Sequence, residues 1–259
     1  MRYCWLALAT GLVGGAALHA QPQPGTPAPA ASRLDYLLQR WEQEMKGVQT
    51  LVAQCQRFEK DKINGTEEVY VGTARFLRPN LAVLDMQKQN NPNVYEKFVC
   101  NGNLLYEYRP LQKVVRIHEL PTPREGQQFD DSFLGLLFGM NAEEAKRRYD
   151  LRLVKEDQWY VYVEIFPRFA ADKVDFQKAR LVLNQNTFLP RELWFEQPNG
   201  NEVKWDMPKI QSGVRLEARE FTPPGTPPGW NVVRVPRPQA VAPAANDPMP
   251  APRVVRPNQ

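Results

Sequence analysis

Histidine and cysteine are scarce in this chain of 259 residues, which contains only two histidines and three cysteines. We expect His19 to be removed with an N-terminal leader, so a nucleophile–histidine system would depend on His118 alone. His118 ends a strand-like run, where a surface or hydrogen-bonded histidine is the simpler interpretation. The motifs HExxH, CxxC, GxGxxG and GxxxxGK[ST] do not occur. We therefore predict no catalytic residues, no metal site and no cofactor.

Long apolar runs are also missing, with one exception at the start of the chain. Residues 1–20 begin with Arg2, continue through mostly apolar residues and end on Ala20. This pattern predicts a secretory signal peptide that is cleaved near Ala20. An uncleaved anchor is the weaker alternative, because a bilayer requires roughly 20 apolar residues. We expect a periplasmic or secreted protein with peripheral membrane contact at most.

The excess of positive charge lies at the two ends of the chain. The formal net charge is +4, yet residues 21–221 carry as many acidic as basic side chains. A neutral domain argues against binding to nucleic acid. Proline and alanine dominate residues 21–31, and a longer proline-rich segment follows at 233–259. We predict a linker, a folded domain at 32–232 and a disordered tail.

Two cysteines, Cys55 and Cys100, remain after the leader. They could form one disulfide or remain as buried thiols. Both fall in strand-like runs that two further runs separate, which favours buried thiols.

Most of the domain has the pattern of β-strands joined by short turns. Asn-Gly pairs at 64–65, 101–102 and 199–200 suit tight hairpins, because both residues tolerate positive φ angles. This pattern predicts an antiparallel meander. The β-rich runs lie at about 48–60, 67–77, 81–88, 94–100, 103–109, 112–118, 151–155, 158–166, 178–184, 189–196, 202–206 and 213–221.

Two segments have helical periodicity instead. Apolar residues recur on one face from Leu34 to Met45, and Ser32 is the predicted N-cap. Residues 130–149 begin with a dense apolar patch, after which Asn141 is positioned to cap a second helix. We expect both helices to cover a curved sheet.

Strand alternation places Tyr70, Ala74 and Phe76 on one face of the run 67–77, while the other face is also fairly apolar. One apolar face would pack against the helices, and further apolar residues could line a cavity. A tightly filled core is the equally good alternative.

Several short segments occur in an order that resembles the LolA/LolB-like superfamily of periplasmic outer-membrane lipoprotein carriers. They are "LLQRWEQEMKGVQTLVAQCQRF", "FLRPNL", "VCNGNLLYEYRP", "SFLGLLFG" and "REFTPPGTPPGWNV". The resemblance covers about residues 32–232 and is nearest to a planctomycete-type LolA-like domain of unknown role. It implies a mainly β fold, an open antiparallel half-barrel of about 11 strands wrapped around an N-terminal helix and a central helical lid.

The resemblance also implies a site. The half-barrel would hold the acyl chain of a lipid or lipoprotein without chemistry, and the strand-end arginine of the family corresponds to Arg78. This arginine would bind to the lid and keep the carrier closed, whereas an exposed strand-end arginine is the alternative. A monomer is expected. The residues predicted for the cavity and latch are Leu38, Trp41, Tyr70, Ala74, Phe76, Arg78, Phe133 and Leu137.

A second hypothesis is an envelope sensor or scaffold that binds a protein or peptide partner on the same fold, since sheet edges suit peptide addition. An enzyme is the least favoured hypothesis, because the required groups are missing.

Overall fold

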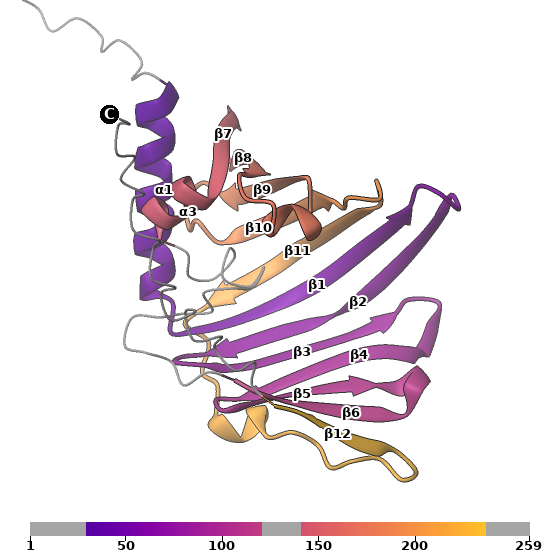
Figure 1. The fold of residues 1–259 in the computed structure, drawn as a ribbon. Helices are drawn as coiled ribbons and strands as arrows, with labels where there is room; N and C mark the ends of the chain where they lie inside the picture. Colours follow the sequence, from indigo (N-terminus) through magenta and orange to yellow (C-terminus); the bar gives the residue numbers. More distant parts are fainter. Residues whose placement is uncertain (1–29, 121–140, 237–259) are drawn as a thin grey trace, which may run out of the picture.

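The computed structural model describes residues 30–120 and 141–236. Within these residues, twelve strands form one open sheet with the order β12-β6-β5-β4-β3-β2-β1-β11-β10-β9-β8-β7 (Figure 1). The strands are β1 (Thr50–Asp61), β2 (Thr66–Leu77), β3 (Leu81–Lys88), β4 (Asn91–Asn101), β5 (Leu104–Arg109), β6 (Val114–Glu119), β7 (Tyr149–Glu156), β8 (Tyr160–Pro167), β9 (Lys178–Asn184), β10 (Pro190–Glu196), β11 (Glu202–Ser212) and β12 (Asn231–Val235).

The sheet consists of two consecutive meanders, β1–β6 and β7–β11, which meet where β1 pairs with β11. Neighbouring strands are antiparallel except for β12, which pairs with β6 in parallel. The glycine of each Asn-Gly pair has a positive φ, at 67° for Gly65, 104° for Gly102 and 82° for Gly200. All three connect strands that pair with each other, so the predicted hairpin turns are confirmed.

The helices are α1 (Ala30–Gly47) and α3 (Ala142–Arg148), and short 3-10 turns occur at η1 (Pro110–Gln112), η2 (Asp172–Val174) and η3 (Ala218–Phe221). Helix α1 begins at Ala30, so the prediction of Ser32 as N-cap is wrong. The cap of α3 is confirmed, because the Asn141 side chain accepts a hydrogen bond from the Glu144 amide at 2.7 Å.

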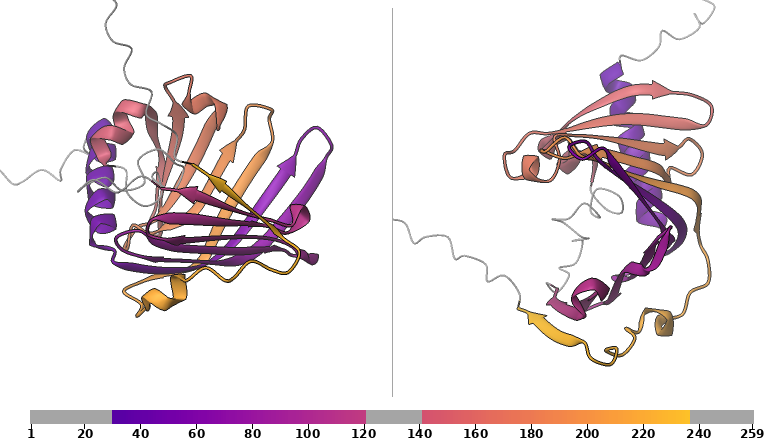
Figure 2. Two further views of the ribbon diagram at one scale, coloured as in Figure 1. Left: turned by 60° about the horizontal axis from the view of Figure 1, so that its bottom comes forward. Right: turned by 90° about the vertical axis from the view of Figure 1, so that its right-hand side faces the viewer.

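The sheet is strongly curved, with α1 inside the curve and the segment that leads from β11 to β12 outside it (Figure 2). Each side has its own apolar core. Helix α1 buries Leu37, Leu38, Trp41 and Met45 in the inner core, together with residues of both meanders. The outer core is smaller and contains Val83, Val99, Tyr108, Val115, Ile117 and Phe221.

The C-terminal part differs from the sequence-based expectation. The strand predicted at 213–221 is wrong, because this segment leaves the sheet and packs Leu216 and Phe221 into the outer core. The strand β12 was not expected, and it extends past the predicted domain boundary at residue 232. The apolar residues of 213–221 indicated burial correctly, but they are buried against a sheet face rather than in a ladder.

The two cysteines in the described part of the chain, Cys55 and Cys100, are both free and buried, so the buried-thiol interpretation is confirmed. The predicted linker at 21–31 overlaps the start of α1 at Ala30. The leader, the tail beyond residue 236, Phe133 and Leu137 lie outside the described residues.

Candidate functional site

The candidate site is the inner face of the sheet, which we define as the face that α1 covers. Register fixes its residues: Leu51 is opposite Phe76, Ala53 opposite Ala74, Cys55 opposite Gly72, and Arg57 opposite Tyr70. Toward Leu51 the strands meet α1, which we call the helix end. Toward Tyr70 they approach the β1–β2, β3–β4 and β5–β6 turns, which we call the hairpin end (Figure 1). The two ends differ in polarity.

The helix end is apolar and tightly packed. Leu38, Trp41 and Tyr70 are buried in the inner core, and Ala74 and Phe76 pack against it while remaining partly exposed. The structure therefore brings together five of the predicted cavity residues. Four of them lie in the layer between α1 and the sheet toward the helix end, and Tyr70 lies toward the hairpin end.

One buried donor within this layer finds no acceptor in the part of the chain that the structure describes. The Trp41 side chain is 5% exposed, and its indole Nε1 is buried without a hydrogen-bond partner among the described residues. A buried polar group that lacks a partner costs about 1–3 kcal/mol. The inner core thus contains an unused hydrogen-bond donor in apolar surroundings.

The middle of the inner face depends on close backbone approach at Gly72. A Cβ added there would lie 1.9 Å from the carbonyl oxygen of Asp85 and 2.8 Å from the Cα of Met86. Met86 lies opposite Gly72 on β3 and is completely buried. The missing side chain at Gly72 is what allows Met86 to fill the centre of the face.

Arg78 lies at the helix end and contacts the C-terminus of α1. Its Nε donates to the carbonyl oxygen of Val48 at 2.5 Å, and its Nη2 donates to that of Met45 at 2.8 Å. Backbone carbonyls at a helix C-terminus lack partners within the helix, so a cation there satisfies them and interacts favourably with the helix dipole. Burial lowers the pKa of Arg78 below the usual arginine value. The strand β2 ends directly before this residue, which therefore joins the sheet to the helix.

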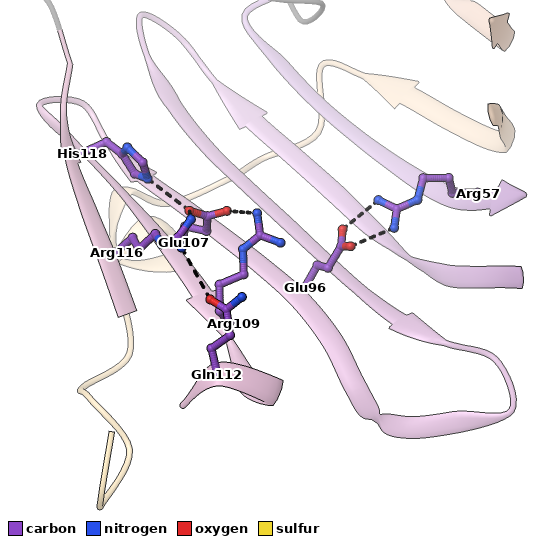
Figure 3. A network of polar contacts seen from close by, with 7 residues as sticks. All are labelled: Arg57, Glu96, Glu107, Arg109, Gln112, Arg116 and His118. Carbon is purple, nitrogen blue, oxygen red and sulfur yellow. Dashed lines mark hydrogen bonds and ion pairs between the residues drawn. The ribbon is translucent and has the colours of Figure 1, made fainter. Parts of the chain in front are cut away.

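Toward the hairpin end the inner face becomes charged, beginning with a buried arginine. Arg57 binds the Glu96 carboxylate through both terminal nitrogens, at 2.7 and 2.9 Å (Figure 3). Its guanidinium also lies 4.4 Å from the ring centroid of Tyr70 and 5.2 Å from that of Trp205. Burial raises the pKa of Tyr70 to about 12, and a hydrogen bond to the Glu68 carboxylate acts in the same direction. Arg57 thus joins β1 to β4 and packs between aromatic rings.

A second cluster surrounds Glu107 on β5 (Figure 3). The Glu107 carboxylate is almost completely buried and forms an ion pair with Arg109. It also accepts a hydrogen bond from His118 Nε2 at 3.1 Å and lies 4.0 Å from Nη1 of Arg116. Arg116 has one further contact, at 3.5 Å to the side-chain oxygen of Gln112.

Sequence reasoning did not identify either charged cluster as part of the site. The polar residues could be seen in the sequence. Glu107 and Arg109 lie on the same face of their strand, and Arg116 and His118 lie on the same face of the next. Only the β5–β6 register, which pairs Glu107 with Arg116, shows that these polar positions meet on the inner face.

The described residues contain no group of three or more His, Cys, Asp or Glu side chains that could hold a metal ion.

Within residues 30–120 and 141–236, neither helix is long and apolar enough to cross a membrane.

No family model and no curated protein matches this chain. Among solved structures, it is similar to an uncharacterized conserved protein from Thermus thermophilus, with 12% identity, a TM-score of 0.48 and coverage of 80% of this chain and 100% of that chain. A LolA superfamily protein from Nitrosomonas europaea matches at 11% identity and a TM-score of 0.32, over 72% and 97% of the two chains.

The complex of MucA and MucB from Pseudomonas aeruginosa matches at 13% identity and a TM-score of 0.41, over 74% of this chain and 61% of that chain.

Proposed function

We propose that this chain is an exported, non-enzymatic binding or carrier protein that holds the acyl chain of a lipid or lipoprotein on the inner face of its half-barrel. The acyl chain would enter the layer between α1 and the sheet. There it would contact Leu38, Trp41, Ala74 and Phe76. Each methylene that leaves water contributes about 0.8 kcal/mol. The methylenes of the acyl chain would therefore bind without any hydrogen bond or ion pair to the protein.

The observation that carries this proposal is the buried Trp41 indole, whose Nε1 has no hydrogen-bond partner within residues 30–120 and 141–236. A filled structural core normally pairs every buried donor. An ester or amide carbonyl within a bound lipid would satisfy Nε1 of Trp41 and remove the penalty of an unpaired donor. The rest of the layer offers aliphatic and aromatic surface, which suits the chain itself.

Release would be controlled by the position of α1. Arg78 binds the C-terminal carbonyls of this helix, so we assign it the role of a latch between sheet and helix. An opening motion of this kind needs no covalent change.

Native mass spectrometry of the protein purified from its own cell envelope tests the proposal. A co-purifying lipid or lipoprotein acyl chain is the expected result. Replacement of Trp41 by Phe keeps an aromatic ring at this position but removes the indole N–H. It should weaken retention of an acyl ester more than retention of the corresponding alkane. Protein that carries no lipid and does not take up acyl esters in vitro would overturn the proposal.

A second candidate function is an envelope sensor or scaffold that binds a protein or peptide. The strand β12 favours it, because it lies at one end of the described sheet and exposes Val232 and Val233. An extended peptide could add to such an edge through main-chain hydrogen bonds. A bound protein partner together with an empty inner layer in the same mass spectra would support this function instead.

A further inference from the structure

The inner face is polarised from end to end. Its helix end is aliphatic and aromatic, whereas its hairpin end carries two charged clusters, one around Arg57 and the other around Glu107. A surface with this gradient suits an amphiphile whose chain lies near α1 and whose head group lies toward the hairpin end. The charged clusters decide which kind of head group would fit.

The Arg57 cluster has little left to offer a ligand. The Arg57 side chain is only 9% exposed, both of its terminal nitrogens bind the Glu96 carboxylate, and its Nε lies 2.7 Å from the Glu59 carboxylate. The charges of Arg57 and its two acidic partners leave no positive excess. This cluster joins strands and packs the face.

The Glu107 cluster is different in both charge and exposure. One carboxylate is shared by two guanidinium groups, which leaves an excess of one positive charge without counting His118. The side chains of Arg109 and Arg116 are 40% and 41% exposed, whereas that of Glu107 is 7% exposed. The positive groups are thus accessible, and the negative one lies beneath them.

Arg116 is the least satisfied member of this cluster. Its distances to Gln112 and Glu107, 3.5 and 4.0 Å, are beyond the usual range for a strong hydrogen bond. Nε of Arg109 is buried and has no hydrogen-bond partner in the described part of the chain. The guanidinium groups of Arg109 and Arg116, from adjacent strands, thus both lie beside the buried Glu107 carboxylate and are both partly exposed. Planar forks of this kind bind phosphate and carboxylate groups through paired hydrogen bonds.

We propose that Arg109 and Arg116 bind the anionic head group, a phosphate or a carboxylate, of an amphiphile whose chain lies at the helix end, and that Glu107 positions both arginines. This inference rests on the proposed function, because it names the class of ligand for the same inner face. The amphiphile is therefore negatively charged, and its head lies at the β5–β6 side of the hairpin end.

Displacement of the neutral fluorophore N-phenyl-1-naphthylamine from the purified protein tests this inference with three competitors: hexadecyl phosphate, hexadecanol and inorganic phosphate. Hexadecyl phosphate should bind at least about tenfold more tightly than hexadecanol, since hydrogen bonds to charged groups contribute that much. Arg116→Gln should remove most of this preference while leaving hexadecanol unchanged, and Arg116→Lys should restore part of it.

Arg180→Gln is the matched control. Arg180 is 44% exposed and pairs with Glu192 at 3.4 Å. Its register partner Glu164 is adjacent in sequence to Ile165, a residue of the inner core. Because side chains alternate along a strand, Glu164 and Arg180 face outward. This variant should keep the full preference for hexadecyl phosphate. Thermal melting of each variant shows whether a change in binding reflects loss of the fold.

The outcomes separate the two proposals. If hexadecanol displaces the fluorophore but the phosphate group adds nothing, or if Arg116→Gln and Arg180→Gln behave alike, the head-group assignment is wrong and the acyl-chain proposal stands. If inorganic phosphate binds as tightly as hexadecyl phosphate, the cluster is a site for a free anion and the assignment is also wrong. If neither the fluorophore nor any alkyl compound binds, both proposals fail.

Discussion

Replacement of Arg78 by Leu should loosen α1 from the sheet without unfolding the domain. Arg78 makes two hydrogen bonds to the C-terminal carbonyls of α1, at 2.5 and 2.8 Å. A charged donor contributes about 1.5–3 kcal/mol per hydrogen bond when solvent is excluded. Because Arg78 is only partly buried, we take about 2 kcal/mol for the pair, which corresponds to about 30-fold in the equilibrium between docked and undocked helix.

The assay is hydrogen exchange of the α1 amides, measured together with the rate at which a bound acyl compound is released. In Arg78→Leu, both rates should rise by about 30-fold, since both begin with release of the C-terminal end of α1 that Arg78 holds. The change in ligand retention should exceed the change in melting temperature.

Arg75→Leu is the control for a general loss of stability. Arg75 lies on the same strand but on the outer face, where it pairs with Glu220 at 3.3 Å. Its replacement should lower the overall stability of the domain yet leave exchange of the α1 amides unchanged. If both variants accelerate α1 exchange equally, or if Arg78→Leu has no effect on it, Arg78 does not act as a latch.

Two further predictions concern the packing of the inner face and the attachment of α1. Gly72→Ala should destabilise the domain by at least about 2 kcal/mol in urea unfolding, since the new methyl group would collide with backbone at Met86; a change below about 0.5 kcal/mol would show that the strands separate easily. The pKa of Glu42 is held below its usual value mainly by a hydrogen bond from the Ala142 amide. The pKa of Glu156 is held below its usual value mainly by a hydrogen bond from Arg33. Lowered folded-state pKa values stabilise the protein above the unfolded value near 4.5, and this stability is lost as pH falls through the folded values. Urea unfolding at pH 7 and pH 3 should therefore show a smaller acid-induced loss in Glu156→Gln than in the parent protein, and equal losses would contradict the contribution of Glu156.

Local patterns in the sequence were enough to predict the hairpins and the helices, whereas the half-barrel was implied by the family resemblance. The Asn-Gly pairs marked three hairpins because glycine accepts the positive φ that those turns require. The periodic apolar residues of α1 marked the face that it buries, and Asn141 marked the start of α3. Each of these features depends on neighbours within a few residues along the chain.

The remaining features depend on contacts between distant segments. The parallel strand β12 pairs with β6 across more than a hundred residues, and no local signal specifies such a partner. The roles of Arg57 and Arg116 were equally hidden. Arg57 and Arg116 both lie on strands, yet one is buried between rings and the other is half exposed beside a buried carboxylate. Exposure of an arginine is decided by strand register and sheet curvature, which the sequence of a single strand does not contain.

The area that α1 buries limits how a ligand can enter. Four apolar side chains of the helix, Leu37, Leu38, Trp41 and Met45, are almost completely buried. At about 1.5–3 kcal/mol for each, exposing all four would require about 6–12 kcal/mol, far more than the contribution of Arg78. That is as large as the whole stability of an ordinary domain, so complete undocking into water would be too rare to support exchange of ligand. An acyl chain that replaced this surface would need about 8–15 buried methylenes to compensate, at about 0.8 kcal/mol each. Ligand entry and helix displacement must therefore occur together, with the chain covering apolar surface as α1 leaves it, and Arg78 then sets the free energy of the first step.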